Sequence, residues 1–474
     1  MTHTSTPRTL FDKIWEDHLI RDYGDGFGLV FVDRQVLQEL GAPWFDPLKK
    51  RGLKVPYPRY NFAVSDHSPQ TLFAGRRSQE LRVTSWTRAM RERTEEHGIT
   101  HFDIDSPNQG ISSIVAGELG ISLPGATVTV YDSHGCTLGA TGAAAWASGA
   151  GEVTQTLATQ TSLMRKPPTM RINIEGKPGA GVSAKDVLLH VIRKVGAGSA
   201  AGHAVELAGS AIRAMTMEER FTACNLGVEL GSRTVQVAPD ETTFEYLKGR
   251  KYAPTGANWD AAVNDWRALP SDAGAKFDRE ATVDVSGLEP QISWGISPGD
   301  VIGISERVPD PRNAASAQER SRIEGALSYT GLKAGAHFEG TPIDFVFIGS
   351  CANNRISDLR LAAGLAKGRK VAGSVVAWVI PGSQLIKKQA EDEGLDEVFR
   401  TAGFNWGEPG CSMCGGQGNG FTEILKPGMR AVSTISRNFP NRQGRGSITH
   451  LASPAMAVAA AVAGCITDVR KIQT

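Results

Sequence analysis

Short apolar runs alternate with helical spacing of apolar residues along most of the chain. Residues 343–348 form a mostly apolar run that predicts a buried strand, residues 359–366 follow with helical spacing, and 375–380 is a second apolar run. This order predicts a strand–helix–strand unit with parallel strands. Because the same alternation recurs elsewhere, the sequence predicts α/β domains with mainly parallel sheets.

Start and stop signals locate two further helices. Ser183, with Asp186 three residues later, predicts the N-terminal cap of a helix that runs to about Lys194. Ser453 and an Ala-rich run that ends at Gly464 predict a second, buried helix.

Other stretches mark connections. Residues 170–174 alternate like a strand directly after the Pro-containing break at 166–168, which predicts a domain boundary near residue 167. The stretch 250–330 is polar and is expected to form irregular peripheral structure. A length of 474 residues exceeds what one hydrophobic core usually supports, so two to four domains are expected.

Composition and charge narrow the class of protein. Hydrophobic residues make up 41% and charged residues 21%, which is ordinary for a globular protein. The net charge of +1 gives no electrostatic reason to expect nucleic acid or an anionic membrane as the main partner. Residues 1–12 lack an apolar signal core, and a cytoplasmic protein is expected. Six cysteines are few for this length, so reduced thiols are expected, some of them able to bind a metal.

Polar clusters follow four of the predicted strands. They are Asp66-His67 after residues 62–64, Asp132-Ser133-His134 after 128–130, Gly349-Ser350-Cys351 after 343–348, and Ser436-Arg437-Asn438 after 431–434. Ligand sites of open α/β sheets lie beyond the carboxyl ends of strands. The four clusters therefore predict one shared cleft.

The pair Cys411 and Cys414 forms a C-x-x-C motif in a turn after Pro409-Gly410. Such a pair fits a redox-active dithiol, half of a zinc site, or part of an iron–sulfur set. Cys351 also follows a predicted strand. Three thiolates would suit a four-iron cluster with one open iron, which can act as a Lewis acid. The other cysteines, Cys136, Cys224 and Cys465, are expected to be small core residues.

Acidic, imidazole and guanidinium groups supply candidate chemistry. A carboxylate beside an imidazole, as in Asp66-His67 and in Asp132-Ser133-His134, can orient a general acid, although capping or turn pairs look the same. Arg437, Arg442 and Arg445 lie in a Gly-containing segment that can bind carboxylates. A solvated or RNA-contacting basic loop would have the same composition.

Taken together, the chain resembles the large subunits of 3-isopropylmalate dehydratases, in the aconitase superfamily, over essentially its whole length. The motifs that carry the resemblance occur in the family's order: Asp132-Ser133-His134, Cys224-Asn225 with Glu229, Ala238-Pro239-Asp240-Glu241-Thr242-Thr243, Gly349-Ser350-Cys351, Pro409-Gly410-Cys411-Ser412-Met413-Cys414, Arg437-Asn438-Phe439, Arg442-Gln443-Gly444-Arg445-Gly446 and Ser453-Pro454-Ala455-Met456-Ala457.

The resemblance implies three α/β domains, residues 1–167, 168–300 and 301–474, around a [4Fe-4S] cluster with one labile iron that binds substrate. Cys351, Cys411 and Cys414 would hold the cluster. His67, paired with Asp66, would be the acid that protonates the leaving hydroxyl. A hydrogen-bonded set around the water at the open iron would consist of Asp132, His134 and Glu229. The substrate-binding groups would be Ser133, Asn225, Arg437 and Arg442.

The resemblance also implies a reaction and a partner. The reaction is dehydration and rehydration of a hydroxy diacid, with 2-isopropylmalate to 3-isopropylmalate in leucine biosynthesis as the first expectation. The family's base is a serine on a swivelling domain; this chain ends at Thr474 without one, so a small partner subunit is expected. Two alternatives stay open, a paralogue acting on another substituted malate and a non-catalytic cluster-sensing or RNA-binding relative.

Several positions depart from the family pattern. The usual Gly-Asp-Ser-His-Thr is here Tyr131-Asp132-Ser133-His134-Gly135, and the histidine that pairs with the aspartate of that motif is replaced by Ser113. The first cysteine motif reads Cys351-Ala352-Asn353-Asn354 in place of Cys-Thr-Asn-Ser. Ser436 replaces an asparagine, and Trp44 replaces a glutamine that contacts substrate in the wider superfamily. Because these changes surround the substrate while the cysteines and arginines persist, a different substrate is an open alternative.

Overall fold

The computed structural model describes residues 6–72, 82–415 and 424–472. The chain divides into two compact units, and each is described by itself. Unit 1 comprises Met1–Asp66, Thr84–Glu175 and Gly198–Asp284, and unit 2 comprises His67–Val83, Gly176–Ala197 and Val285–Thr474.

Unit 1 is built around a five-stranded parallel sheet with the order β5-β4-β3-β6-β7. Its strands are β3 (Arg34–Gln38), β4 (Asn61–Val64), β5 (Thr100–Phe102), β6 (Thr127–Val130) and β7 (Ala144–Ala147). Every side chain of β4 and β6 is buried, as expected for parallel strands that helices cover on both faces.

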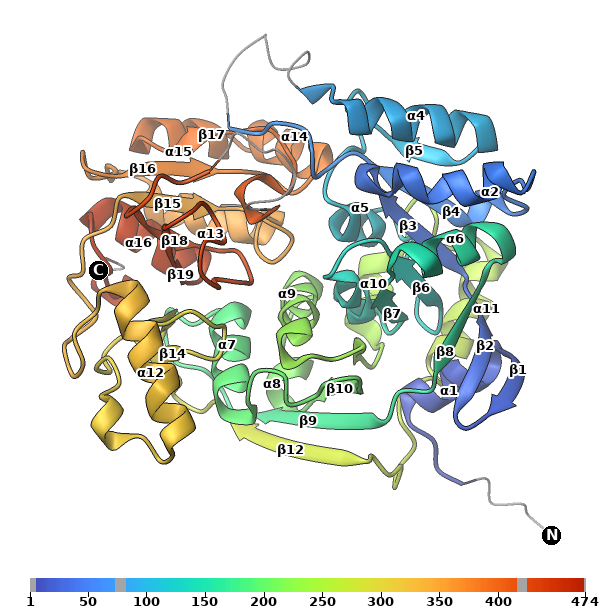
Figure 1. Ribbon diagram of the computed structural model, residues 1–474, viewed down its shortest axis with the longest axis horizontal. Helices are drawn as coiled ribbons and strands as arrows, with labels where there is room; N and C mark the ends of the chain where they lie inside the picture. Colours follow the sequence, from blue (N-terminus) through green and yellow to red (C-terminus); the bar gives the residue numbers. More distant parts are fainter. Residues whose placement is uncertain (1–5, 73–81, 416–423, 473–474) are drawn as a thin grey trace. The chain divides into compact units, whose positions relative to one another are not determined.

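Two further sheets belong to unit 1. The parallel sheet β11-β10-β9-β12 contains β9 (Thr169–Glu175), β10 (Ala204–Ala208), β11 (Thr234–Val237) and β12 (Arg279–Asp284). Figure 1 shows β9 and β12 as long neighbouring arrows, and the two strands pair in parallel. The antiparallel sheet contains β1 (Leu19–Gly24), β2 (Phe27–Phe31) and β8 (Thr161–Arg165).

The helices of unit 1 connect and cover these sheets (Figure 1). They are α1 (Leu10–His18), α2 (Asp46–Lys50), α4 (Ser85–His97), α5 (Ser112–Glu118), α6 (Ala150–Thr159), α8 (Ser210–Arg213), α9 (Met217–Gly227), α10 (Glu241–Leu247) and α11 (Ala257–Trp266). Three short 3-10 helices carry candidate site residues or their neighbours: η1 (Glu39–Phe45), η3 (Gly135–Thr141) and η4 (Val228–Leu230).

Unit 2 contains a second five-stranded parallel sheet, with the order β17-β16-β15-β18-β19. Its strands are β15 (Phe345–Ile348), β16 (Val376–Val379), β17 (Asn405–Trp406), β18 (Arg430–Ser433) and β19 (Ile448–Leu451), and β13 (Gln291–Ser293) pairs with β14 (Val301–Gly303) separately. Its helices are α7 (Ala184–Val195), α12 (Ala317–Thr330), α13 (Ile356–Ala366), α14 (Gln384–Asp392), α15 (Leu395–Ala402) and α16 (Pro454–Ala463).

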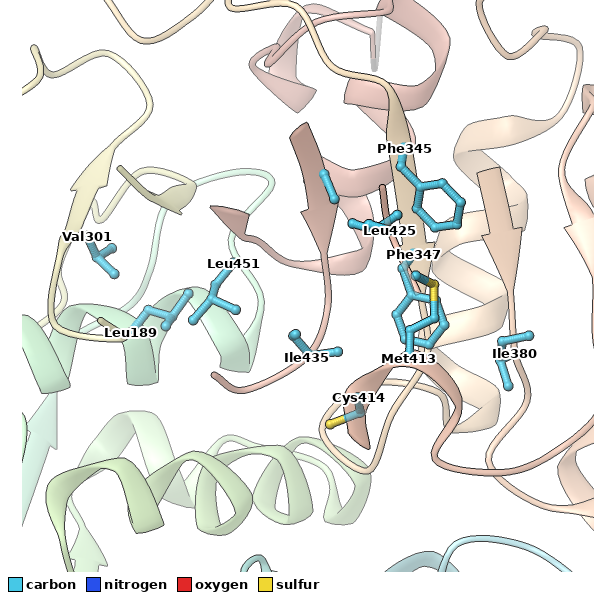
Figure 2. Close-up of a cluster of buried hydrophobic side chains, with 11 residues drawn as sticks. Leu189, Val301, Phe345, Phe347, Ile380, Met413, Cys414, Leu425, Ile435 and Leu451 are labelled. Atoms are coloured by element: carbon cyan, nitrogen blue, oxygen red, sulfur yellow. The ribbon is translucent and has the colours of Figure 1, made fainter. Parts of the chain in front are cut away.

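A buried apolar cluster lies along this sheet (Figure 2). Phe345 and Phe347 of β15 contribute to it, together with Leu189 of α7 and Met413 of the cysteine-containing turn. Figure 2 shows Met413 beside Phe347, whereas the sulfur of Cys414 points away from that ring. The Met413 side chain therefore packs in the core of unit 2, and the thiol of Cys414 follows it in the same turn.

Most elements expected from the sequence are present. The runs at 62–64, 128–130, 170–174, 343–348, 375–380 and 431–434 overlap β4, β6, β9, β15, β16 and β18, respectively. The strand–helix–strand unit β15–α13–β16 has parallel strands, as expected. The backbone N–H of Ser183 donates to Asp186 at 2.8 Å and caps α7. Ser453 caps α16, which ends at Gly464.

The expectation of irregular structure over 250–330 was wrong. This stretch contains α11, α12 and the strands β12 to β14. Only Trp266 is buried in α11, and only Ile323, Ala326 and Thr330 are buried in α12. A helix that buries so few side chains can be polar almost throughout, so composition alone does not reveal it.

Each of the ranges 1–167, 168–300 and 301–474 contains one of the three parallel sheets. The proposed domain boundaries stay a prediction, because the two compact units are assembled from interleaved segments. Within the described part of the chain, no helix has both the length and the apolar character needed to cross a membrane.

Candidate active site

The two five-stranded sheets share one topology. In each, the chain enters at a central strand (β3 or β15), continues outward to one side, and returns to the other side of that strand at β6 or β18. This change of direction is where open α/β sheets bind ligands, beyond the carboxyl ends of the strands. Asp132 follows β6, and Cys351 and Arg437 follow β15 and β18.

In unit 1 the imidazole of His134 lies between two carboxylates. Its Nδ1 is 3.6 Å from Asp132 Oδ1, and its Nε2 is 3.5 Å from Glu229 Oε1. The backbone N–H of His134 also donates to Asp132 Oδ1 at 2.6 Å, and Ser133 Oγ lies 3.2 Å from Nδ1. His134 is only 3% exposed, so these contacts are largely shielded from water. The structure thus brings Glu229 next to Asp132 and His134, which lie far from it in the sequence.

Asn225 joins this cluster through a threonine. The side chain of Asn225, in α9, donates from Nδ2 to Thr137 Oγ1 at 2.9 Å. That hydroxyl in turn donates to the backbone carbonyl of His134 at 2.6 Å. The neighbouring cysteines Cys136 and Cys224 are buried, and Cys136 Sγ donates to the carbonyl of Cys224 at 3.2 Å. Their environment is that of small core residues, as the sequence predicted.

Asp66 is completely buried at the end of β4. Its Oδ2 accepts a hydrogen bond from the backbone N–H of Ser112 at 2.9 Å, at the start of α5. Its own backbone N–H donates to Glu39 Oε2 at 2.9 Å. The next residue, His67, is half-buried and is the first residue of unit 2.

The three candidate ligand cysteines of unit 2 are all buried, and none of them forms a disulfide. Cys351 follows β15, and Cys411 and Cys414 lie in and beside η6 (Ser412–Gly415) after β17. A ring nitrogen of His67 and the Sγ of Cys411 lie within 4.8 Å of each other. Both cysteine loops have strained backbone, because Ser350 and Ser412 adopt φ values of 75° and 52°. Such conformations are common where a loop is shaped around a ligand.

A buried arginine that the sequence analysis did not single out supports the loop before Cys411. Arg82 is 1% exposed, and its Nη2 donates to the carbonyl of Pro409 at 2.7 Å while Nη1 contacts Glu408 at 3.1 Å. The backbone N–H of Glu408 donates to the carbonyl of Thr71 at 3.0 Å. A Cβ at Gly407 would come within 2.6 Å of that same carbonyl, so only glycine fits there.

Lys185 is a second residue that the sequence analysis missed. Its ammonium group is completely buried and donates to the backbone carbonyls of Thr434 and of Ile435, the latter at 2.8 Å. Burial lowers the pKa of Lys185 to about 7, while nearby acidic groups, Cys414 and Cys351 among them, act in the opposite direction. The signal in the sequence was a lysine in the apolar stripe of a helix, three and four residues before Leu188 and Leu189.

The residues around the cysteines fit an iron–sulfur cluster. Both polar atoms of the Asn354 side chain and the Oγ of Ser412 are buried and have no hydrogen-bond partner among the described residues. Arg442 Nη2 lies 3.8 Å from Cys414 Sγ. Three thiols, unpaired polar groups and a cation beside one sulfur are what an anionic cluster with sulfide acceptors would require.

Three of the positions that depart from the family pattern, Ser113, Gly135 and Trp44, belong to unit 1. Ser113 is buried in α5, and its Oγ has no hydrogen-bond partner in the described part of the chain. A Cβ at Gly135 would come within 2.8 Å of the backbone of Trp146, so the backbone here has no room for the family's threonine. Trp44, in η1, packs edge-to-face on Tyr131 with ring centroids 6.2 Å apart.

The chain was compared with known families, sequences and structures. Residues 12–464 match the model of a family described as the aconitase family (aconitate hydratase). The chain is 51% identical over 467 residues to 3-isopropylmalate dehydratase large subunit 1 of Bradyrhizobium diazoefficiens, an alignment that covers 98% of this chain and 97% of the relative. The crystal structure of aconitase X from Thermococcus kodakaraensis in its holo-form aligns with a TM-score of 0.44 and 11% identity, over 90% of this chain and 89% of that chain.

Proposed function

The chain belongs to the aconitase family, and on that premise we propose that it is the large subunit of a hydro-lyase that converts 2-isopropylmalate to 3-isopropylmalate. The observation that carries this proposal is the group of three buried thiols at the carboxyl edge of one parallel sheet, with a His67 ring nitrogen within 4.8 Å of the Cys411 sulfur. An acid beside a ligand cysteine is what removal of a hydroxyl group requires.

The proposed cofactor is a [4Fe-4S] cluster held by Cys351, Cys411 and Cys414. When bound, it supplies a Lewis acid for the substrate hydroxyl and a carboxylate. Arg442, whose guanidinium lies 3.8 Å from a ligand sulfur, and Arg437 bind the substrate carboxylates. These two arginines orient the substrate so that its hydroxyl faces the acid.

The acid and the water-holding residues come from different elements. His67 donates a proton to the leaving hydroxyl, which departs as water while a proton is lost from the neighbouring carbon and a double bond forms. Asp132, His134 and Glu229 hold the released water, and the position of the His134 imidazole between both carboxylates supports this role. Readdition of water at the other carbon gives the isomer, with Ser133 and Asn225 binding substrate and Asp66 orienting His67.

The proton on carbon needs a base from another chain. The relative from Bradyrhizobium diazoefficiens is named a large subunit, and we propose that this chain likewise acts with a small subunit, whose serine removes that proton. The large chain alone is then expected to bind the cluster without turning over substrate.

The experiment is anaerobic turnover of the cluster-loaded complex of large and small subunits, followed by the absorbance of the unsaturated product. Turnover of both 2- and 3-isopropylmalate, absent with either subunit alone, is the expected result. Turnover of another substituted malate but not of isopropylmalate would overturn the substrate assignment and keep the reaction type. No turnover of any hydroxy diacid by a complex with intact cluster absorbance would overturn the proposal.

A further inference from the structure

The aromatic pair Trp44 and Tyr131 lies after β3 and β6 of the unit 1 sheet, at the change of direction where open α/β sheets bind ligands. Trp44 lies in η1, which begins directly after β3, and Tyr131 directly follows β6. β3 and β6 are the neighbouring strands at which the chain changes direction. Tyr131 is also joined to Asp132 by a peptide bond, so the pair lies next to the carboxylate–imidazole cluster.

The two rings are held in a fixed arrangement. Their planes meet at 73° with centroids 6.2 Å apart, the edge-to-face geometry that aromatic pairs favour. The backbone N–H of Tyr131 donates to the carbonyl of Val36 in β3 at 2.9 Å, and the carbonyl of Trp44 accepts from Thr154 at 2.9 Å. A Cβ at Gly41 would come within 3.2 Å of the Tyr131 ring, so glycine makes room for the pair.

Both rings are half-buried and pack on one side against the core of unit 1. The indole Nε1 of Trp44 is a buried donor with no hydrogen-bond partner in the part of the chain that the structure describes. Ser113 Oγ is also buried without a hydrogen-bond partner among the described residues. Buried donors usually find a partner, so polar groups that lack one at a ligand-binding position indicate contact with a ligand or water.

We propose that Trp44 and Tyr131 are specificity-determining residues that contact the hydrocarbon substituent of the malate. The inference rests on the proposed function and deepens it. Two rings supply an apolar surface, on which each buried CH₂ group of a substituent stabilises binding by about 0.8 kcal/mol. A substituent that ends in a carboxylate would lose its hydration against this surface without gaining a charged partner. The site therefore selects malates with branched hydrocarbon substituents.

The test compares 2-isopropylmalate with 2-methylmalate in the cluster-loaded complex. In Trp44→Gln and in Tyr131→Ala, the ratio of kcat/KM for isopropyl over methyl should fall about tenfold or more, since the lost contact serves only the larger group. Trp44→Phe keeps the ring surface and should retain most of the ratio. Trp86→Gln, at an exposed tryptophan of the same unit, is the matched control and should leave both values unchanged.

The outcomes separate the inference from the proposed function. Equal losses for both substrates in Trp44→Gln and Trp44→Phe, with normal cluster absorbance, would indicate a structural role and overturn the inference alone. An unchanged ratio in well-folded variants would do the same. Failure of the wild-type complex to turn over any substituted malate would overturn the proposed function and, with it, this inference.

Discussion

The two parallel five-stranded sheets have the same strand topology but differ in how far their ligand-binding edges keep the family pattern. The edge in unit 2 retains all three cysteines and both arginines of the family motifs, with changes limited to neighbours such as Ala352 and Ser436. The edge in unit 1 keeps Asp132 and His134 but differs at several surrounding positions. A cluster demands fixed ligands, whereas the residues around a substrate can change while the chemistry is preserved.

The edges also differ in what supports them. In unit 2, buried cations hold backbone carbonyls: Arg82 binds Pro409, and Lys185 binds Thr434 and Ile435. In unit 1, side chains hold one another, as in the contacts of His134 with Asp132 and Glu229. Backbone support fixes a loop regardless of neighbouring substitutions, so the cysteine edge is the more constrained of the two.

The largest expected effect comes from removing a proposed cluster ligand at the cysteine edge of unit 2. Cys411→Ser replaces a thiolate with a hydroxyl that binds iron weakly, so the visible absorbance of the cluster and all turnover should be lost. Cys465→Ser is the control in the same unit, because Cys465 lies beside Thr467 and outside the candidate site. Retention of both cluster and turnover in Cys411→Ser would remove Cys411 from the ligand set.

A smaller effect is expected at His67, where a substitution should lower turnover without loss of the cluster. His67→Ala removes the proposed proton donor and should lower kcat by about 10²–10⁴-fold while the cluster absorbance persists. His337→Ala, at an exposed histidine of unit 2, is the control and should leave kcat unchanged. A full rate in His67→Ala would assign the acid role to another group, with His134 as the next candidate.

The backbone support at the cysteine edge predicts a loss of stability. Lys185→Met leaves two buried carbonyls unsatisfied, at about 1–3 kcal/mol each, so the apo-protein should unfold more easily by about 3 kcal/mol. The cluster should also be lost faster in air, since a positive charge near Cys351 and Cys414 is gone. Lys194→Met, at an exposed lysine of the same helix, is the control. Wild-type unfolding and cluster lifetime in Lys185→Met would show that the edge does not depend on this lysine.

Features encoded by local sequence patterns were predicted correctly. Contacts to backbone groups far away in the sequence were missed. The apolar run of β15, the caps of α7 and α16 and the C-x-x-C motif are local, and the first three elements formed as expected. The partners of Lys185 are carbonyls 249 and 250 residues away, and no side chain marks them. The position of Lys185 in an apolar stripe was a usable signal for its burial, but it could not identify the partner.

Acid should weaken both sheets through one buried histidine in each, on the edge strands β19 and β5. Burial lowers the pKa of His450 to about 3 and that of His101 to about 4. Below pH 6.5 the unfolded chain therefore gains a proton that the folded chain does not, so stability falls as the pH decreases, down to about 3 for His450 and about 4 for His101.

The substitution His450→Gln tests this pH dependence of stability. Through His450 alone, the free energy of unfolding should fall by about 1.4 kcal/mol per pH unit below pH 6.5, or by about 2 kcal/mol at pH 5. His450→Gln can still accept from Arg430 and donate to the carbonyl of Ser293, the partners that His450 has at 2.6 Å and 2.8 Å, without titrating. Denaturant unfolding at pH 7 and pH 5 should show that His450→Gln loses less stability than the wild type. His101→Gln should reduce the loss in unit 1 in the same way. Equal losses in the wild type and His450→Gln would mean that His450 becomes protonated in the folded protein, and that the edge of the unit 2 sheet opens to water in acid.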